Sequence, residues 1–293
     1  MSSPIHPRLR IAAIDFLNPA PLMWDFEHPP LNTGLARRYQ IDRMTPSECA
    51  DRLAAGRAHP KHADLGLVPI AALATNPSLR ILPGCTIASK RRVRSLLLVH
   101  RASQPLTAVR SVAADTASRT TLAYARILFH RWGNAAVPFL PLSADLDAML
   151  DRADAAILIG DPALLALEEQ ANRFERTGEQ LRYVDLAEAW TAHMHVPFVS
   201  AVWGAAHGSR FDDRVVDDLI QSRIHGLENI DALVAEWSHK LPIPEETIRT
   251  YLTTNIHYIL DEECIEGMRV FFRLAAELRV LPEYSVDIPG PMV

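Results

Sequence analysis

Short apolar runs alternate with helix-start signals along most of the chain, and this alternation most limits the folds available to it. The run at 11–14 has four apolar residues in succession, which is typical of a strand buried on both faces. Comparable runs occur at 63–69, 93–100, 153–159 and 196–203. Strands that alternate with helices favour parallel sheets covered on both faces, so the sequence predicts an α/β protein.

The helix signals are local and specific. Thr45, Pro46 and Glu48 together predict an N-cap, a first helical residue and a capping box. A buried strand at 153–159 leads into Asp161 and Pro162, which are expected to cap and begin the next helix. Beyond about residue 212 the chain is expected to be mainly helical, over 215–224, 230–237, 245–252 and 263–278.

At 293 residues the chain is longer than one typical domain, and 48% of it is hydrophobic, which is enough for two cores. We expect a clamshell of two lobes joined by crossing strands. Lobe I would be discontinuous, 1–97 and 198–293, and lobe II would be 98–197, with the active site in the cleft between them.

Composition argues against several classes of partner. The net charge is −5 and no basic stripe is present, so a nucleic-acid partner is not expected. No stretch approaches the ~18 apolar residues that cross a bilayer, and no signal peptide is evident. Three widely separated cysteines suggest a reducing compartment, so we expect a cytoplasmic protein. The sequence does not fix the oligomeric state, which stays open between a monomer and a homodimer.

Polar residues gather where the predicted strands end and helices begin. Pro19 turns the chain at Asn18 and aims this amide at the crevice that lies beyond the carboxyl ends of strands. An Asn that only organises the turn is an equally good interpretation from this segment alone. Ser95, early in its strand, and the following residues complete the candidate set: Thr116, Ser118, Arg119, Thr120, Gly160 and Asp161.

These groups suit a small anionic metabolite. Free amides at helix starts and hydroxyl groups donate to carboxylates, and Arg119 could form a bidentate pair. Structural roles compete: Ser118 and Asp161 could simply cap helices, and Arg119 could face water. Phosphate-loop, nucleophile-elbow and zinc-protease motifs are missing, and His193 with His195 is a weak metal signal, so neither metal nor cofactor is expected.

Taken together, the order and spacing of several segments resemble the chorismate dehydratase family, whose members catalyse the first step of the futalosine route to menaquinone. The resemblance covers nearly the whole chain. It rests on Phe16-Leu17-Asn18-x-x-Pro21-Leu22, Val93-Arg94-Ser95-Leu96-Leu97, Ser118-Arg119-Thr120-Thr121, the strand 153–161, Pro197-Phe198-Val199-x-Ala201-Val202-Trp203, and Tyr251-Leu252-Thr253-x-Asn255-Ile256-x-Tyr258 with Gly267 and Phe271.

The resemblance implies a type II periplasmic-binding-protein fold and the conversion of chorismate to 3-[(1-carboxyvinyl)oxy]benzoate and water. It places Asn18 and Ser95 on the family's active-site Asn and Ser, and the 116–120 loop on its substrate-binding loop. Two departures are Lys90-Arg91-Arg92, where relatives often have a small turn, and Ala117, where some carry a hydroxyl.

The named motifs contain no His, Lys or Glu, so we expect Asn18 and Ser95 to orient the substrate while its own enolpyruvyl carboxylate removes the proton. Two alternatives stay open. The sister enzyme that forms 1,4-dihydroxy-6-naphthoate would need a His in the cleft, for which His100 is the nearest candidate. A binding protein for a small carboxylate would share the fold without the chemistry.

Overall fold

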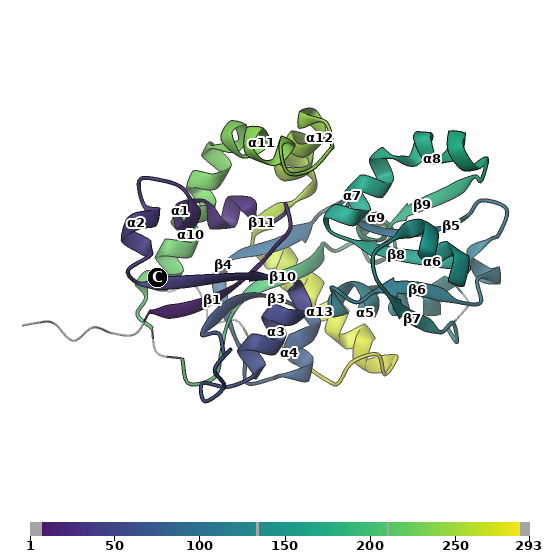
Figure 1. The fold of residues 1–293 in the computed structure, drawn as a ribbon. Helices are drawn as coiled ribbons and strands as arrows, with labels where there is room; N and C mark the ends of the chain where they lie inside the picture. The colour runs from purple at the N-terminus through teal and green to yellow at the C-terminus, as the bar shows by residue number, and fades with distance from the viewer. Residues whose placement is uncertain (1–7, 133–134, 210, 288–293) are drawn as a thin grey trace, which may run out of the picture.

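The strands of the protein form two separate sheets (Figure 1). The computed structural model describes residues 8–132, 135–209 and 211–287. The first sheet has the order β11-β4-β10-β3-β1-β2. Its strands are β1 (Leu9–Ile14), β2 (Tyr39–Met44), β3 (Leu65–Pro69), β4 (Arg80–Ser89), β10 (Phe198–Ala205) and β11 (His257–Ile259).

The second sheet has the order β7-β6-β8-β5-β9. Its strands are β5 (Leu96–Arg101), β6 (Val112–Asp115), β7 (Phe139–Leu142), β8 (Ala155–Ile159) and β9 (Leu181–Asp185). The chain therefore passes from the first sheet to the second between β4 and β5, and returns between β9 and β10. The exact lobe boundaries, 97/98 and 197/198, stay a prediction.

Both sheets are mixed, so the prediction of parallel sheets is wrong in part. β1 runs parallel to β2 and β3, and β6 runs parallel to β7 and β8. In contrast, β10 is antiparallel to β3 and β4, and β5 is antiparallel to β8 and β9. β11 is antiparallel to β4 as well. β5 and β10 are the strands that follow each passage between the sheets, so neither is joined to a neighbouring strand by the crossover within one sheet that parallel pairs need.

Helices cover the sheets as the alternating pattern predicts, and the capping box of Thr45 and Glu48 is confirmed. Helices α1 (Trp24–Glu27), α2 (Asn32–Leu35), α3 (Pro46–Ala54) and α4 (Ala71–Thr75) belong to the first lobe. The second lobe contains α5 (Arg119–Trp132), α6 (Leu146–Arg152), α7 (Asp161–Glu168), α8 (Gln170–Thr177) and α9 (Leu186–Met194).

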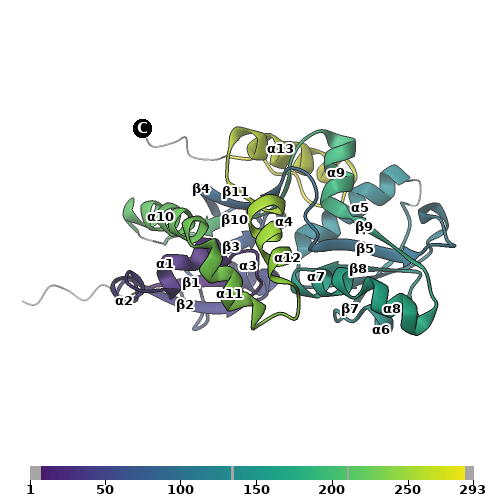
Figure 2. The ribbon, with the colours of Figure 1, turned by 90° about the horizontal axis from the view of Figure 1, so that it is seen from above.

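The expected C-terminal helices are also present: α10 (Arg214–Glu228), α11 (Ile230–Ser238), α12 (Glu245–Thr250) and α13 (Glu262–Glu277). Seen from above, α11 and α12 run along the first lobe and reach α7 of the second (Figure 2). There the Thr247 hydroxyl lies 3.4 Å from a Glu168 oxygen. The last third of the chain therefore wraps the first lobe and also meets the second.

A cluster of aromatic side chains joins the two lobes. The Tyr124 ring of α5 stacks on Phe198 of β10 at 3.8 Å and lies 4.3 Å from Phe271 of α13. Its hydroxyl donates to the Val199 carbonyl. A Cβ added at Gly267 would lie 2.6 Å from the Pro197 carbonyl oxygen, so this glycine lets α13 approach the segment that returns to the first sheet.

Candidate functional site

Asn18 lies beyond the end of β1, where the sequence places it. The following residues form a 3-10 turn, Ala20–Met23. The Tyr258 hydroxyl of β11 donates to the Asn18 main-chain oxygen at 3.0 Å. The side-chain Oδ1 of Asn18 is buried and has no hydrogen-bond partner among the described residues. An unpaired buried acceptor is costly, so this oxygen retains the capacity to accept a hydrogen bond.

Ser95 is held by an unusual backbone segment immediately before β5. The predicted strand from 93 begins only at Leu96, because Arg94 has a left-handed conformation with φ +68°. The Asp185 carboxylate accepts the main-chain N–H groups of Val93 at 3.0 Å and Arg94 at 2.6 Å. A non-glycine residue in this conformation is held by its surroundings, and such strain is common at functional sites.

Tyr251 links these two residues, although sequence reasoning did not select it. It lies in a π-helical turn, Tyr251–Asn255, that follows α12. Its hydroxyl donates to Ser95 Oγ at 2.8 Å, and contact with the Asn18 side chain also favours ionisation of the phenol. Burial dominates and raises the pKa of Tyr251, so the phenol stays neutral. We call Asn18, Ser95 and Tyr251 the central cluster.

Gly160 and Asp161 approach the central cluster from the second lobe. The Gly160 N–H donates to the Ser95 carbonyl at 2.8 Å, and the Leu17 N–H donates to Asp161 Oδ1 at 3.0 Å. The prediction that Asp161 caps α7 is wrong: Gly160 occupies the N-cap, and Asp161 is the first helical residue. Gly160 has φ +70°, and an added Cβ would lie 2.8 Å from the Phe16 ring.

Burial makes the Asp161 carboxyl a weaker acid than an ordinary aspartate. Desolvation raises the pKa of this carboxyl to about 6, and the nearby charge of Asp15 acts in the same direction. The hydrogen bond from the Leu17 amide opposes the shift without cancelling it. Asp161 is therefore a titratable group poised near neutral pH at the contact between the lobes.

The 116–120 loop reaches across to the first lobe, but its described contacts are with α3 and α4. The Thr120 hydroxyl is fully buried and accepts the Ala71 N–H at 3.0 Å. Ser118 Oγ accepts the Thr121 N–H in the first turn of α5. Exposed Arg119 pairs with Asp51 of α3 at 2.7 Å, and the Ser47 hydroxyl donates to the main-chain oxygens of Thr116 and Ala117.

The histidines considered from sequence lie away from the central cluster. His100 is buried near the opposite end of β5 from Ser95, ~16 Å away for an extended strand. Its ring binds the Arg101 carbonyl, and burial lowers its pKa. His193 lies in the last turn of α9 and His195 is the left-handed C-cap of that helix, so this pair does not lie on a strand.

Among the described residues, a possible metal-ligand group lies at the start of α13. Potential ligand atoms of His257, Asp261 and Cys264 all lie within 4.8 Å of one another. However, Asp261 Oδ2 is bound by both His257 Nε2 and Lys90 Nζ, each at 2.8 Å, and Oδ1 accepts the Cys264 N–H at 2.9 Å. The Lys90 ammonium already supplies the positive charge that a metal ion would bring to Asp261. These contacts therefore cap α13 and hold the residue that follows β4.

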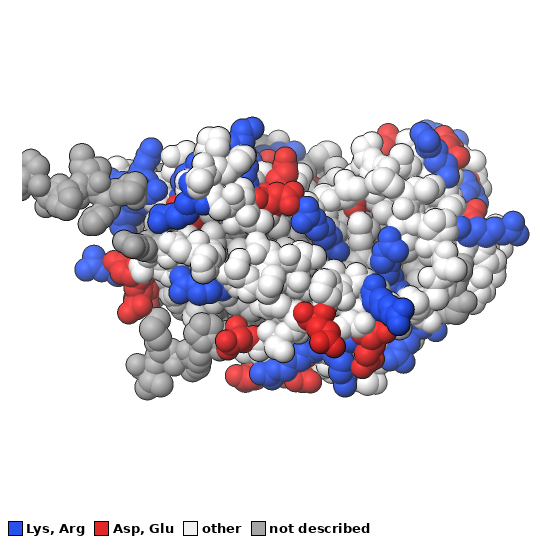
Figure 3. Space-filling model, turned by 90° about the horizontal axis from the view of Figure 1, so that it is seen from below, with Lys and Arg blue, Asp and Glu red and all other residues white. Residues whose placement is uncertain are grey.

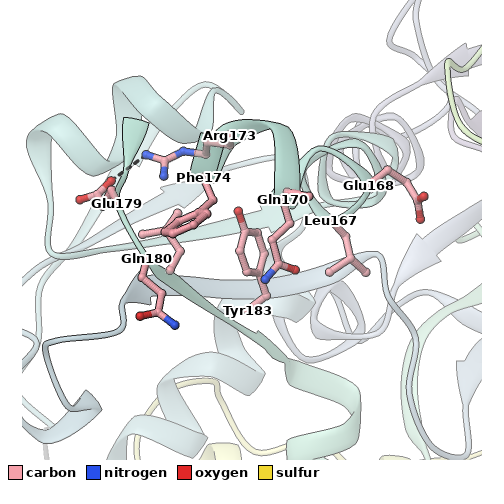
Figure 4. Close-up of a pocket in the computed structure, with 10 residues that line it drawn as sticks. Leu167, Glu168, Gln170, Arg173, Phe174, Glu179, Gln180 and Tyr183 are labelled. Carbon is pink, nitrogen blue, oxygen red and sulfur yellow. Dashed lines mark hydrogen bonds and ion pairs between the residues drawn. The ribbon is translucent and has the colours of Figure 1, made fainter. Parts of the chain in front are cut away.

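A pocket of about 410 Å³ lies between α7, α8 and β9 (Figure 4). Phe174 and Tyr183 project into it beside Gln170, while the buried Arg173 turns toward Glu179 at its rim. The lining contains none of the residues predicted for the site. Ser95 and Tyr251 are 1% and 0% exposed, whereas Asn18 is partly exposed, so Asn18 is the member of the central cluster that solvent reaches in this arrangement of the lobes.

Similarity to solved structures defines the class of fold. The chain superposes on a protein from Archaeoglobus fulgidus with a TM-score of 0.67, at 14% identity, over 94% of this chain and 98% of the other. It superposes on the periplasmic aliphatic sulphonate binding protein of Escherichia coli with a TM-score of 0.65, at 17% identity, over 97% and 96%. The protein has the two-lobed α/β fold of periplasmic binding proteins, as the sequence predicts.

Sequence comparisons identify the family of the chain, which the fold alone does not. A family model described as menaquinone biosynthesis matches residues 9–277, and the chain belongs to this family. A chorismate dehydratase from Thermus thermophilus is 27% identical over 201 residues, which are 66% of this chain and 72% of that protein. The resemblance to chorismate dehydratases is confirmed at this level of identity.

Helix hydrophobicity and surface charge can also be described. In the part of the chain that is described, no helix has both the length and the apolar character to cross a membrane. On the face shown in Figure 3, basic and acidic side chains are interspersed around a broad uncharged area.

Proposed function

We propose that this protein is a chorismate dehydratase, which converts chorismate to 3-[(1-carboxyvinyl)oxy]benzoate and water. The central cluster carries the proposal. It places a carboxamide, whose buried oxygen has no partner among the described residues, beside a neutral phenol that is hydrogen-bonded to a serine, and the three come from distant parts of the chain. The family and the Thermus relative support this assignment.

The reaction breaks the C3–H and C4–O bonds of chorismate, forms the C3–C4 double bond of an aromatic ring, and releases water. Aromatisation supplies the driving force, so the protein needs to position the substrate more than to supply a strong acid or base. Asn18 and Ser95 would orient the substrate and its leaving hydroxyl. The enolpyruvyl carboxylate, held near C3, would take the proton.

Asp161 offers a direct test of that assignment of the base. Its pKa of about 6 makes it the one group of our predicted site with a value shifted toward neutrality. If the substrate is the base, kcat/KM of the wild type and of Asp161→Asn should show the same pH dependence near pH 6. If a limb near pH 6 is lost in Asp161→Asn, Asp161 takes part in proton transfer instead.

The predicted substrate-binding role of Thr116, Ser118, Arg119, Thr120, Gly160 and Asp161 depends on movement of the lobes. Since Ser95 and Tyr251 are buried, we expect chorismate to reach them when the lobes separate. We expect hinges near 95–100 and 195–200. Solution scattering should show a more extended free protein than the complex with product, and identical profiles would argue against this movement.

Incubating the purified protein with chorismate tests the proposed function. Appearance of the aromatic product, followed by ultraviolet absorbance and identified by mass spectrometry, would support it. Calorimetric binding of chorismate without turnover would support a carboxylate-binding protein, as in the sulphonate-binding structural neighbour. Turnover of the precursor of 1,4-dihydroxy-6-naphthoate, with chorismate left intact, would support the sister enzyme.

A further inference from the structure

We propose that Tyr251 is a positioning residue that directs the Ser95 hydroxyl toward the substrate. This inference rests on the proposed dehydratase function and adds a residue to its site. The Tyr251 hydroxyl lies 2.8 Å from Ser95 Oγ, and both side chains are almost completely buried. Tyr251 acts on the reaction through Ser95, so it is distinct from the groups that touch chorismate.

The number of protons on the two hydroxyl groups limits how the pair can donate. A phenol has one O–H donor, and a serine hydroxyl has one donor and two acceptor lone pairs. When Tyr251 donates to Ser95 Oγ, the proton of Ser95 points away from Tyr251. The Ser95 hydroxyl is then free to donate to an oxygen of the substrate, such as the departing C4 hydroxyl.

Burial keeps this arrangement in place across the physiological range. Desolvation raises the pKa of Tyr251 although the contacts with Ser95 and Asn18 lower it, and the charges of Asp161 and Asp185 oppose ionisation further. A neutral phenol keeps its donor proton. Tyr251 can therefore donate to Ser95 whether or not the surrounding carboxylates are ionised.

The π-helical turn forms hydrogen bonds at two points of the segment that leads into β5. Its first residue, Tyr251, binds the Ser95 side chain, while its last residue, Asn255, donates through Nδ2 to the Arg92 carbonyl at 3.2 Å. The turn closes on itself through the Ile256 N–H and the Tyr251 carbonyl. A five-residue turn therefore fixes both the backbone that precedes Ser95 and its hydroxyl, and such π-turns are frequent at functional sites.

Tyr251→Phe is the direct test, because it removes the hydroxyl and keeps the ring. We expect kcat for chorismate dehydration to fall roughly 10–100-fold while KM changes little, since the donor acts on the reacting hydroxyl. In a Ser95→Ala background the same substitution should cause no further loss, because the hydroxyl it orients is gone. Additive losses in the double variant would overturn the proposal.

Tyr124→Phe is the matched control. Tyr124 is another fully buried tyrosine, and its hydroxyl donates to the Val199 carbonyl outside the central cluster. This variant should lose a similar amount of thermal stability and keep its kcat. Equal losses of kcat in both variants would show a general effect of losing a buried hydroxyl and would overturn the proposal.

A second variant keeps the test decisive if Tyr251→Phe does not fold. Asn255→Ala removes the tie to the Arg92 carbonyl and leaves every hydroxyl in place, and we expect a loss in kcat of roughly threefold to tenfold. Unchanged kcat in every folded variant would overturn the role of Tyr251 while the dehydratase function stands. A wild-type protein that leaves chorismate unchanged would overturn the function itself, and this inference with it.

Discussion

The central cluster and the 116–120 loop are both polar regions at the junction of the lobes, yet they use their polar groups differently. In the central cluster, Asn18 Oδ1 is buried and has no hydrogen-bond partner among the described residues, and Ser95 Oγ accepts from Tyr251. In the loop, Thr120 binds the Ala71 amide and Arg119 binds Asp51. The first region keeps capacity for a ligand, while the second uses its groups to join the lobes.

This difference separates two kinds of contribution to function. Under the proposed function, removing a group from the central cluster should affect turnover, because these groups would orient the substrate. Removing a group from the loop should affect how firmly the lobes hold together. Four predictions follow, beginning with the largest expected effect. Three test the contrast between the central cluster and the 116–120 loop, and the one on Asp161 tests the titratable carboxyl at the contact between the lobes.

Ser95→Ala and Asn18→Ala should each lower kcat by about 10²–10³-fold, the usual cost of losing one preorganised donor or acceptor at a reacting centre. Steady-state turnover of chorismate measures this loss. Ser89→Ala is the matched control, since Ser89 is equally buried but lies at the end of β4. Rates near that of the wild type in both cluster variants would remove the central cluster from the mechanism.

Thr120→Val should lower the free energy of unfolding by about 1–3 kcal/mol, because the buried Ala71 N–H loses its acceptor. Urea denaturation measures the change. Thr121→Val provides the control: Thr121 is also buried, but its hydroxyl binds only Ser118 within the same turn. A large rise in KM with unchanged stability would instead assign the Thr120 hydroxyl to the substrate.

Asp161→Asn should stabilise the protein above pH 6. The folded-state pKa is raised to about 6, so the ionised carboxylate opposes folding. This penalty is absent below about pH 4 and develops as the pH rises from ~4 to ~6. We expect a gain of about 1–2 kcal/mol at pH 8, less than the full shift implies because the Leu17 N–H loses a charged acceptor.

Urea denaturation from pH 4 to 8 measures the effect of Asp161→Asn. Asp15→Asn is its control, since Asp15 is exposed and affects Asp161 only through charge. A pH-independent difference between Asp161→Asn and the wild type would contradict the assigned titration.

Arg119→Ala should have the smallest effect, below about 1 kcal/mol in the free energy of unfolding, because its ion pair with Asp51 is exposed on both sides. A double-mutant cycle with Asp51→Ala isolates the pair. If Arg119 instead binds a carboxylate of chorismate, KM should rise more than tenfold with no change in stability, and the division between the two regions would break down.

Local signals predicted the elements that depend on neighbouring residues. The capping box at Thr45, the first strand and all four C-terminal helices are where the sequence places them. β4 went unrecognised because Pro83 and Gly84 interrupt its apolar pattern. It is a strand because it pairs with β10 on one side and β11 on the other, through bulges that accommodate the irregular residues.

The candidate site likewise contains residues that local sequence signals could select and residues that they could not. Asn18 and Ser95 could be selected because each lies at a strand boundary and in a recognisable motif. Tyr251 is 156 residues from Ser95 in the chain, and its segment was recognised only as a helix and as part of the family resemblance, without a role in the site. The capping role expected of Asp161 was wrong because Gly160 occupies that position, which frees the carboxylate to bind the Leu17 amide of the other lobe.

The sequence by itself determined the α/β class, the helix starts, the family and two members of the central cluster, because these follow from periodicity, capping and short motifs. Only the tertiary structure decided the mixed sheets, the phenol that joins Asn18 to Ser95, and the use of the 116–120 loop as a contact between lobes. Those features depend on which distant segments share a buried environment, where each hydrogen bond must be satisfied within the protein or by its ligand.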